Sequence, residues 1–207
     1  MQISKFIPRP TILIFALVVS FEILAMGFLA SGRLHSLIHH EPAAKPSLIG
    51  GPFTLQDQDG MTVTNKDLHG HHSLIFFGYT REQDVTPTEL RVISAALGLL
   101  GADAARFKTY FVTLDPERDQ PALLKSYLAD ISPALTGLTG SPEQVAVMAK
   151  AYHMFYRKLP DPSGGQDYAI DYSPLIYWMG PDEKFIKPFA YTTDAKSLAE
   201  TLKKVLE

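Results

Sequence analysis

The chain has 207 residues, which is enough for one domain with a proper core and an additional segment. Its composition, 46% hydrophobic and 20% charged, is typical of a globular protein and excludes extensive disorder, while a net charge of −3 argues against nucleic acid as a partner. The chain contains no cysteine, which excludes disulfides, thiol redox chemistry, thiolate metal sites and cysteine nucleophiles.

The first predicted element is an N-terminal transmembrane helix over residues 11–31. Its apolar run, Thr11–Ala30, spans about 30 Å as a helix, which is the thickness of the hydrocarbon core of a bilayer. A charged Glu22 near the centre costs about 3 kcal/mol, but roughly a dozen Leu, Ile, Val and Phe residues outweigh it. Lys5 and Arg9 precede the run, so we expect the short N-terminus to stay in the cytoplasm.

This anchor determines the predicted domain organisation. Residues 1–10 form the cytoplasmic N-terminus, residues 32–52 form a tether rich in Pro, Gly and Ala, and residues 53–207 form the domain. The domain would face the periplasm, or the mitochondrial intermembrane space in a eukaryote. A cleaved signal peptide is the alternative, but its apolar region is about 7–15 residues long, and only Ala30-Ser31-Gly32 resembles a cleavage site.

After the tether, the sequence predicts alternating strands and helices. Phe53–Leu55 and Met61–Thr64 flank a hairpin turn, Ser73–Phe77 is a short buried strand, and a helix begins at Pro87. The strands that follow are Thr109–Leu114, Thr136–Thr139, Pro174–Met179 and Phe185–Tyr191. The helices between and after them are Gln120–Ile131, Ser141–Tyr152 and Thr193–Leu206. This order is typical of a thioredoxin-like α/β fold.

Several long motifs lie in the domain. They are the turn FGYTREQDVTPTEL (Phe77–Leu90), VTLDPERDQP (Val112–Pro121), YRKLPDPSGG (Tyr156–Gly165) and a stretch around Asp171, Ser173 and Ile176. Together they resemble the Sco/SenC family, which consists of membrane-anchored thioredoxin-fold proteins that deliver copper for cytochrome c oxidase assembly. The resemblance extends over the anchor, the tether and the domain, in that order.

The chain departs from this family at the copper ligands. The resemblance implies two cysteines and a distant histidine at the positions occupied here by Glu82, Thr86 and Tyr172. Cu(I) prefers sulfur ligands, and a tyrosine with a pKa of about 10 is a poor ligand near neutral pH. We expect Thr86 instead to cap the helix that begins at Pro87, in a capping box with Glu89. The copper site is therefore predicted to be degenerate, with no cofactor bound.

Two other groups could bind a metal. The acidic residues Glu82, Asp84, Asp115 and Asp171 would form an oxygen-ligand site or an acid–base pair, and we expect Asp84 and Asp115 to line the degenerate site. Alternatively, these carboxylates bond local amides or pair with nearby arginines. His69, His71 and His72 could bind copper or zinc, or could simply belong to a solvated loop.

These observations predict a non-catalytic accessory or interaction factor rather than an enzyme. Its link to cytochrome c oxidase assembly comes from the resemblance. Its partners would be the membrane, through the N-terminal helix, and oxidase subunits or other assembly factors. The alternative is a carrier of copper or zinc that uses histidines or carboxylates in place of cysteines. Substitution of His69, His71 and His72 separates the two hypotheses.

Overall fold

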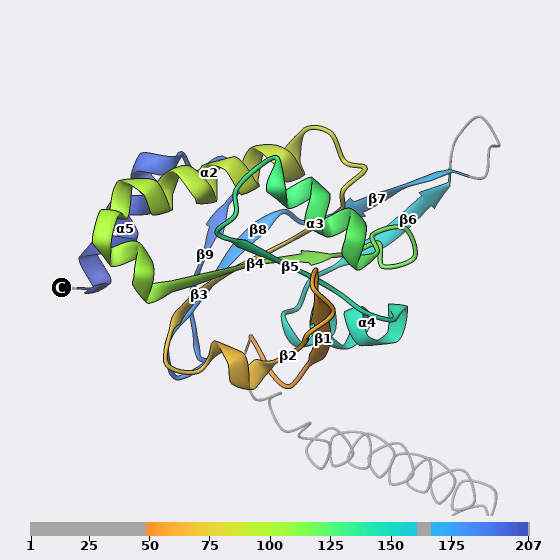
Figure 1. The fold of residues 1–207 in the computed structure, drawn as a ribbon, viewed down its shortest axis with the longest axis horizontal. Helices are drawn as coiled ribbons and strands as arrows, with labels where there is room; N and C mark the ends of the chain where they lie inside the picture. Colours follow the sequence, from red (N-terminus) through yellow and green to blue (C-terminus); the bar gives the residue numbers. More distant parts are fainter. Residues whose placement is uncertain (1–48, 161–166, 207) are drawn as a thin grey trace, which may run out of the picture. The chain divides into compact units, whose positions relative to one another are not determined.

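A computed structural model of the chain describes residues 49–160 and 167–206 (Figure 1). The predicted cytoplasmic N-terminus, the anchor over residues 11–31 and most of the tether lie outside the described residues. Within the two described ranges, no helix is both long enough and apolar enough to cross a membrane.

A seven-stranded sheet forms the centre of the domain, in the order β2-β1-β5-β4-β3-β8-β9. The three middle strands β3, β4 and β5 run parallel, and β1, β2, β8 and β9 pair antiparallel with their neighbours. The bounds are β1 (Thr54–Asp57), β2 (Thr62–Thr64), β3 (His72–Gly78), β4 (Phe107–Thr113), β5 (Leu135–Thr139), β8 (Leu175–Met179) and β9 (Phe185–Ala190).

Helices cover both faces of this sheet. The helices are α2 (Val85–Leu100), α3 (Pro121–Ala129), α4 (Pro142–Ala151) and α5 (Ala195–Leu206), with short 3-10 turns η1 (Asn65–Leu68) and η2 (Gly101–Arg106). In Figure 1, α2 and α3 lie above the sheet and α4 lies below it. The α/β class and the order of these elements are as predicted.

Strand β3 shows why the core has two halves. All seven of its residues are buried, as expected for a strand with neighbours on both sides and helices on both faces. Leu74 and Phe76 join the core cluster under α2, α3 and α5, whereas Ile75 and Phe77 join the cluster that includes α4. The end of β3 is therefore fixed on both faces, which positions the turn that follows it.

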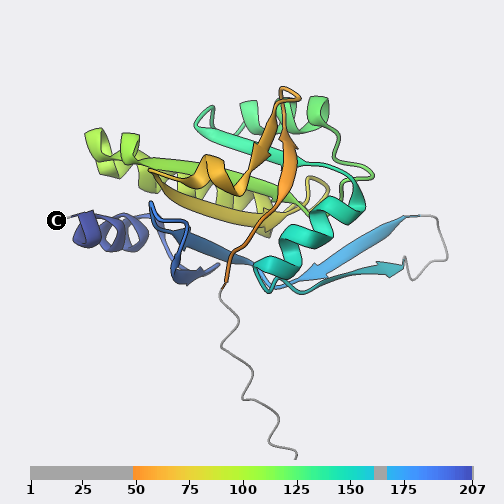
Figure 2. The same cartoon turned by 90° about the horizontal axis from the view of Figure 1, so that it is seen from below.

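One pair of strands was not predicted. Strands β6 (Tyr156–Pro160) and β7 (Tyr168–Tyr172) form an antiparallel hairpin of their own. Figure 2 shows this hairpin extending away from the sheet. Ile170, in the middle of β7, joins the hairpin to the domain, because it lies in the core cluster on the α4 side. The hairpin thereby brings Tyr172 back to the domain.

Candidate functional site at the start of helix α2

Glu82, Thr86 and Tyr172 lie together where β3 passes into α2. The hydroxyl oxygens of Thr86 and Tyr172 are 3.1 Å apart, within hydrogen-bond distance. The Thr86 amide donates to the Glu82 carboxylate, and the Asp84 amide donates to its other oxygen at 2.7 Å. The three positions that were singled out in the sequence are thus brought together, and Thr86 is hydrogen-bonded to both Glu82 and Tyr172.

The start of α2 differs from the prediction. The helix begins at Val85 rather than Pro87, so Thr86 lies inside it and is not its capping residue. Glu82 takes the capping role instead, because its carboxylate accepts from amides of the first turn that have no partner within the helix. Burial disfavours the charge of Glu82, but the amides of Thr86, Asp84 and Val85 outweigh burial and lower the pKa of the carboxyl.

The Thr86 hydroxyl has a second neighbour in the turn. The Tyr79 amide donates to Thr86 Oγ1 at 3.4 Å, and Thr86 is fully buried. Gly78 permits this close approach, because a Cβ at that position would lie 2.6 Å from Thr86 Oγ1. Even the smallest side chain at Gly78 would therefore displace the threonine.

Tyr172 is the last residue of β7, and its hydroxyl lies next to that of Thr86. Its ring meets the Tyr79 ring edge to face, with centroids 6.1 Å apart. The Ile170 amide donates to the Tyr79 hydroxyl at 3.3 Å, which adds a second link between the hairpin and the turn. Burial raises the pKa of Tyr172, so its phenol keeps its proton near neutral pH.

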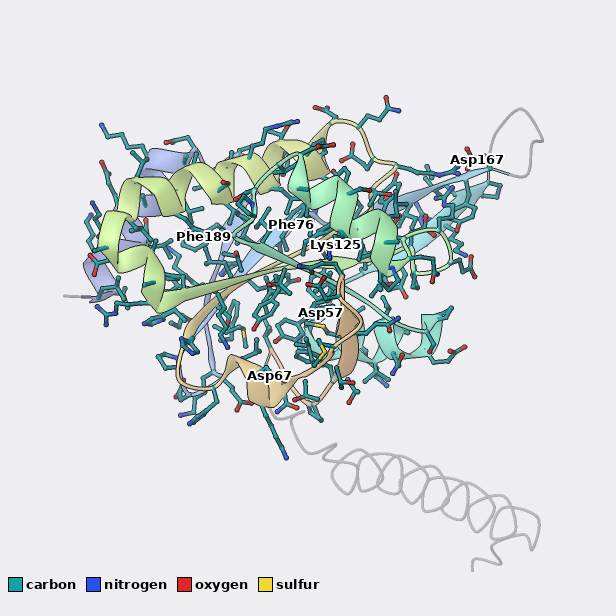
Figure 3. The ribbon with its side chains drawn as sticks, viewed as in Figure 1. Asp57, Asp67, Phe76, Lys125, Asp167 and Phe189 are labelled. Atoms are coloured by element: carbon teal, nitrogen blue, oxygen red, sulfur yellow. The ribbon has the colours of Figure 1, made fainter. Side chains whose placement is uncertain are left out.

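Asp115 lies in the loop after β4 and holds the outer part of the hairpin. Its carboxylate is buried, binds the Arg118 guanidinium and accepts from the Tyr168 hydroxyl at 2.6 Å. Arg118 also contacts Asp167 at 2.6 Å, and its guanidinium lies 3.7 Å from the centre of the Tyr168 ring. Asp167 is labelled in Figure 3 at the end of β7 that borders the grey loop.

Sequence reasoning missed Asp119 as a member of this site. Its carboxylate is fully buried and accepts from the Thr80 amide at 3.0 Å and from the Thr80 and Thr113 hydroxyls at 2.5 and 2.6 Å. Burial raises the pKa of Asp119, although these hydrogen bonds oppose the rise. The only signal in the sequence was its place in the motif Val112–Pro121.

The four acidic residues have separate surroundings. Glu82 caps α2, Asp115 pairs with Arg118, and Asp171 pairs with Arg157 at 2.9 Å on the exposed side of the hairpin. Asp84 is exposed at the start of α2. Within residues 49–160 and 167–206, no three His, Asp or Glu side chains are grouped as a metal would require.

The three histidines also lie in different surroundings. His72 is the first residue of β3, and its Nδ1 accepts from Trp178 Nε1 at 3.1 Å in the core. Burial lowers the pKa of His72. His69 is largely exposed and lies 3.7 Å from Glu183. His71 is half-buried between them, and its amide donates to the Leu68 carbonyl.

The donors at the start of α2 fit Cu(I) poorly. Glu82 already accepts two amides, and Thr86 and Tyr172 offer a hydroxyl and a protonated phenol. All three are oxygen donors, which suit hard cations such as Mg²⁺ better than Cu(I).

Comparison with known proteins identifies the relatives of this chain. The profile described as SCO1/SenC matches residues 41–207. Protein SCO1, mitochondrial, of Saccharomyces cerevisiae is 38% identical over 154 residues, which are 74% of this chain and 52% of the yeast protein. The chain therefore spans about half the length of this relative.

Two solved structures resemble this chain. The structure of Bradyrhizobium japonicum ScoI with copper bound matches with 43% identity and a TM-score of 0.70, covering 75% of this chain and 98% of that one. BsSco, described as having a disulfide switch and as a member of the Sco family of cytochrome c oxidase assembly proteins, matches with 24% identity and a TM-score of 0.60, covering 77% and 94%. At that identity, BsSco shows the fold alone.

These comparisons confirm one prediction and correct another. The thioredoxin-like fold is confirmed by the likeness to the Sco structures. The prediction of no cofactor is wrong, because a relative of 43% identity was solved with copper bound, and copper binding is a property of the matched family. That prediction took the lack of sulfur and imidazole donors at Glu82, Thr86 and Tyr172 to mean that no metal is bound.

Proposed function

The chain belongs to the SCO1/SenC family, and we propose that it is a membrane-anchored accessory factor in cytochrome c oxidase assembly that acts through protein contact. The observation that carries this proposal is the bonding of Glu82, Thr86 and Tyr172 to one another at the start of α2. Side chains that hold a turn and a hairpin in place have a structural role there. A partner would then bind the surfaces of the turn and the hairpin.

The absence of cysteine supports a non-catalytic role. A disulfide switch of the kind described for BsSco needs two cysteines, and this chain has none. The turn can keep its shape without them, because Glu82 holds the first amides of α2. The Sco-like frame therefore persists without thiol chemistry.

The link to the membrane rests on the sequence. The apolar run Thr11–Ala30 would anchor the chain, with the domain in the periplasm or the mitochondrial intermembrane space. The proposed partners are oxidase subunits or other assembly factors, and this link comes from the family. Among the described residues, no three histidines or acids gather at one place, which argues against a carrier that uses histidines or carboxylates.

The proposal is tested in cells from which the chain has been deleted, by measuring assembled cytochrome c oxidase. We expect the natural chain to restore assembly, and a chain with alanine at His69 and His71 to restore it equally well. A chain lacking residues 11–31 should fail, because the domain is no longer held at the membrane. Loss of oxidase assembly on replacing the two histidines would overturn the accessory role in favour of a carrier.

The affinity of the turn for Cu(I) is tested separately, by titration against chelators of known strength. The natural chain is compared with a variant that carries Glu82→Cys, Thr86→Cys and Tyr172→His. We expect the variant to bind Cu(I) at least a hundredfold more tightly, because sulfur and imidazole donors replace oxygen donors. Equal affinity in the two chains would show that copper binds without these three positions, and that their substitution is not what separates this chain from its relatives.

A further inference from the structure

The three bonded residues connect two elements that are distant in the sequence. Glu82 and Thr86 lie at the start of α2, and Tyr172 lies at the inner end of β7, 86 positions after Thr86. A metal bound at these three positions would join the same two elements. We propose that in this chain the Thr86–Tyr172 hydrogen bond, supported by Glu82, is a ligand-independent latch that holds the β6–β7 hairpin against α2.

Glu82 prepares the helix side of the latch. By accepting the amides of Asp84 and Thr86, its carboxylate fixes the backbone of the first turn. Thr86 is then buried, with its hydroxyl between the Tyr79 amide and the Tyr172 phenol. A hydroxyl held in this way can bond to Tyr172 without further loss of side-chain entropy.

The hairpin side of the latch is neutral and partly buried. Tyr172 packs edge to face on Tyr79, and the Tyr79 hydroxyl accepts from the Ile170 amide. Burial raises the pKa of Tyr172, so the bond to Thr86 stays one between two neutral hydroxyls. Such a bond contributes about 0.5–1.5 kcal/mol, which corresponds to a factor of about 2–12 in an opening equilibrium.

The outer end of the hairpin is held differently. Asp167 there pairs with Arg118 at 2.6 Å and with Arg81 at 3.2 Å, and the Asp167 side chain is 62% exposed. Salt screens exposed ion pairs of this kind, whereas it has little effect on a hydrogen bond between two neutral groups. The two ends of the hairpin should therefore respond differently to ionic strength.

The test is amide hydrogen exchange of the full chain, followed in peptides that cover β7. Thr86→Val and Tyr172→Phe each remove one hydroxyl and keep the shape of the side chain, and the double variant completes a cycle. We expect each single variant to speed exchange in β7 by about 2- to 12-fold, and the double variant to add little to the larger single effect. Thr88→Val, on the exposed face of the same helix, is the matched control and should change nothing.

Ionic strength gives a second readout. Raising the salt to about 1 M should speed exchange at the outer end of the hairpin and leave the inner end of β7 in the natural chain unchanged. Unchanged β7 exchange in both single variants, or effects that add fully in the double variant, would overturn the latch. Exchange in β3 and β4 shows whether each variant is folded.

This inference deepens the proposed function, since a latched hairpin gives a partner one fixed surface, but its test does not depend on that function. Hydrogen exchange can support the latch even if deletion of the chain leaves oxidase assembly intact. The deletion experiment can likewise support an assembly role if the latch fails.

Discussion

Asp119 accepts hydrogen bonds from both the amide and the hydroxyl of Thr80, at 3.0 and 2.5 Å, although the two residues are 39 positions apart. Thr80 belongs to the turn before α2, and Asp119 ends the loop after β4. Thr113 adds a third hydrogen bond to the same carboxylate. One buried carboxylate thus ties together the two loops that border the site.

Replacing this carboxylate should therefore be costly. We expect Asp119→Ala to lower the free energy of unfolding by about 2–4 kcal/mol, because three donors lose their acceptor in a buried place. Denaturant unfolding of the full chain measures the change. Asp130→Ala, at the exposed end of α3, is the control and should stay within about 0.5 kcal/mol. A similar loss in both variants would contradict the role given to Asp119.

Glu89 should make stability depend on pH. It is 1% exposed, its Oε2 has no hydrogen-bond partner within the described part of the chain, and burial raises its pKa from 4.5 to about 7. Because the folded pKa exceeds the unfolded one, the stabilising effect of the proton is complete below about pH 4.5 and is lost as the pH rises through about 7. The loss is on the order of 3 kcal/mol.

Glu89→Gln isolates this effect. We expect the unfolding free energy of the natural chain to fall relative to that of the variant between about pH 5 and pH 8. The comparison cancels the contribution of His72, whose lowered pKa acts in the opposite direction in both chains. Parallel pH profiles for the two chains would show that Glu89 does not titrate in this range.

Gly78 should not tolerate a side chain. We expect Gly78→Ala to cost about 1–3 kcal/mol, because the added Cβ would lie 2.6 Å from Thr86 Oγ1 and 3.1 Å from a carbon of the Phe76 ring. Gly98→Ala is the control, since nothing lies within 4 Å of its Cβ and alanine favours the helix by about 0.5–1 kcal/mol. In thermal unfolding, we expect Gly78→Ala to lower the midpoint temperature and Gly98→Ala to raise it. Equal destabilisation by the two substitutions would contradict this prediction.

Arg118 should hold the outer part of the hairpin through its flat guanidinium. We expect Arg118→Lys to speed amide exchange in β6 and β7 several-fold, because an ammonium cannot bind Asp115 and Asp167 at once while stacking on Tyr168. Arg91→Lys, on the exposed face of α2, is the control. If exchange near Tyr168 is unchanged, the guanidinium contacts are not what orders the hairpin.

Local signals in the sequence predicted most of the domain. The start of α4 is correct because its capping box is complete within four residues: Gln144 N donates to Ser141 Oγ, and Ser141 N donates to Gln144 Oε1. The start of α2 was wrong because its cap comes from Glu82, which lies in the turn before the helix. The conformation of that turn depends on contacts with Asp119 and Tyr172, which no short window contains.

Partners that are distant in the sequence also explain why the hairpin and the position of His72 were not predicted. Strand β6 is mostly exposed and lacks the alternation that marks a buried strand, so its pairing with β7 leaves little trace in the sequence. His72 was assigned to a loop, whereas it begins β3, and its partner Trp178 is 106 positions away. Neither partner could be found by reading along the chain.

The position of the Thr86 hydroxyl has a consequence for the order in which substitutions could be made. A chain with Thr86→Cys alone would lose the bond to Tyr172 and leave a partly buried phenol without this partner, while gaining only one sulfur. Tyr172→His alone would likewise face a threonine. Each of these single variants should therefore be less stable than the present chain. A change from this chain to a sulfur site, made one residue at a time, would therefore begin with a loss of stability.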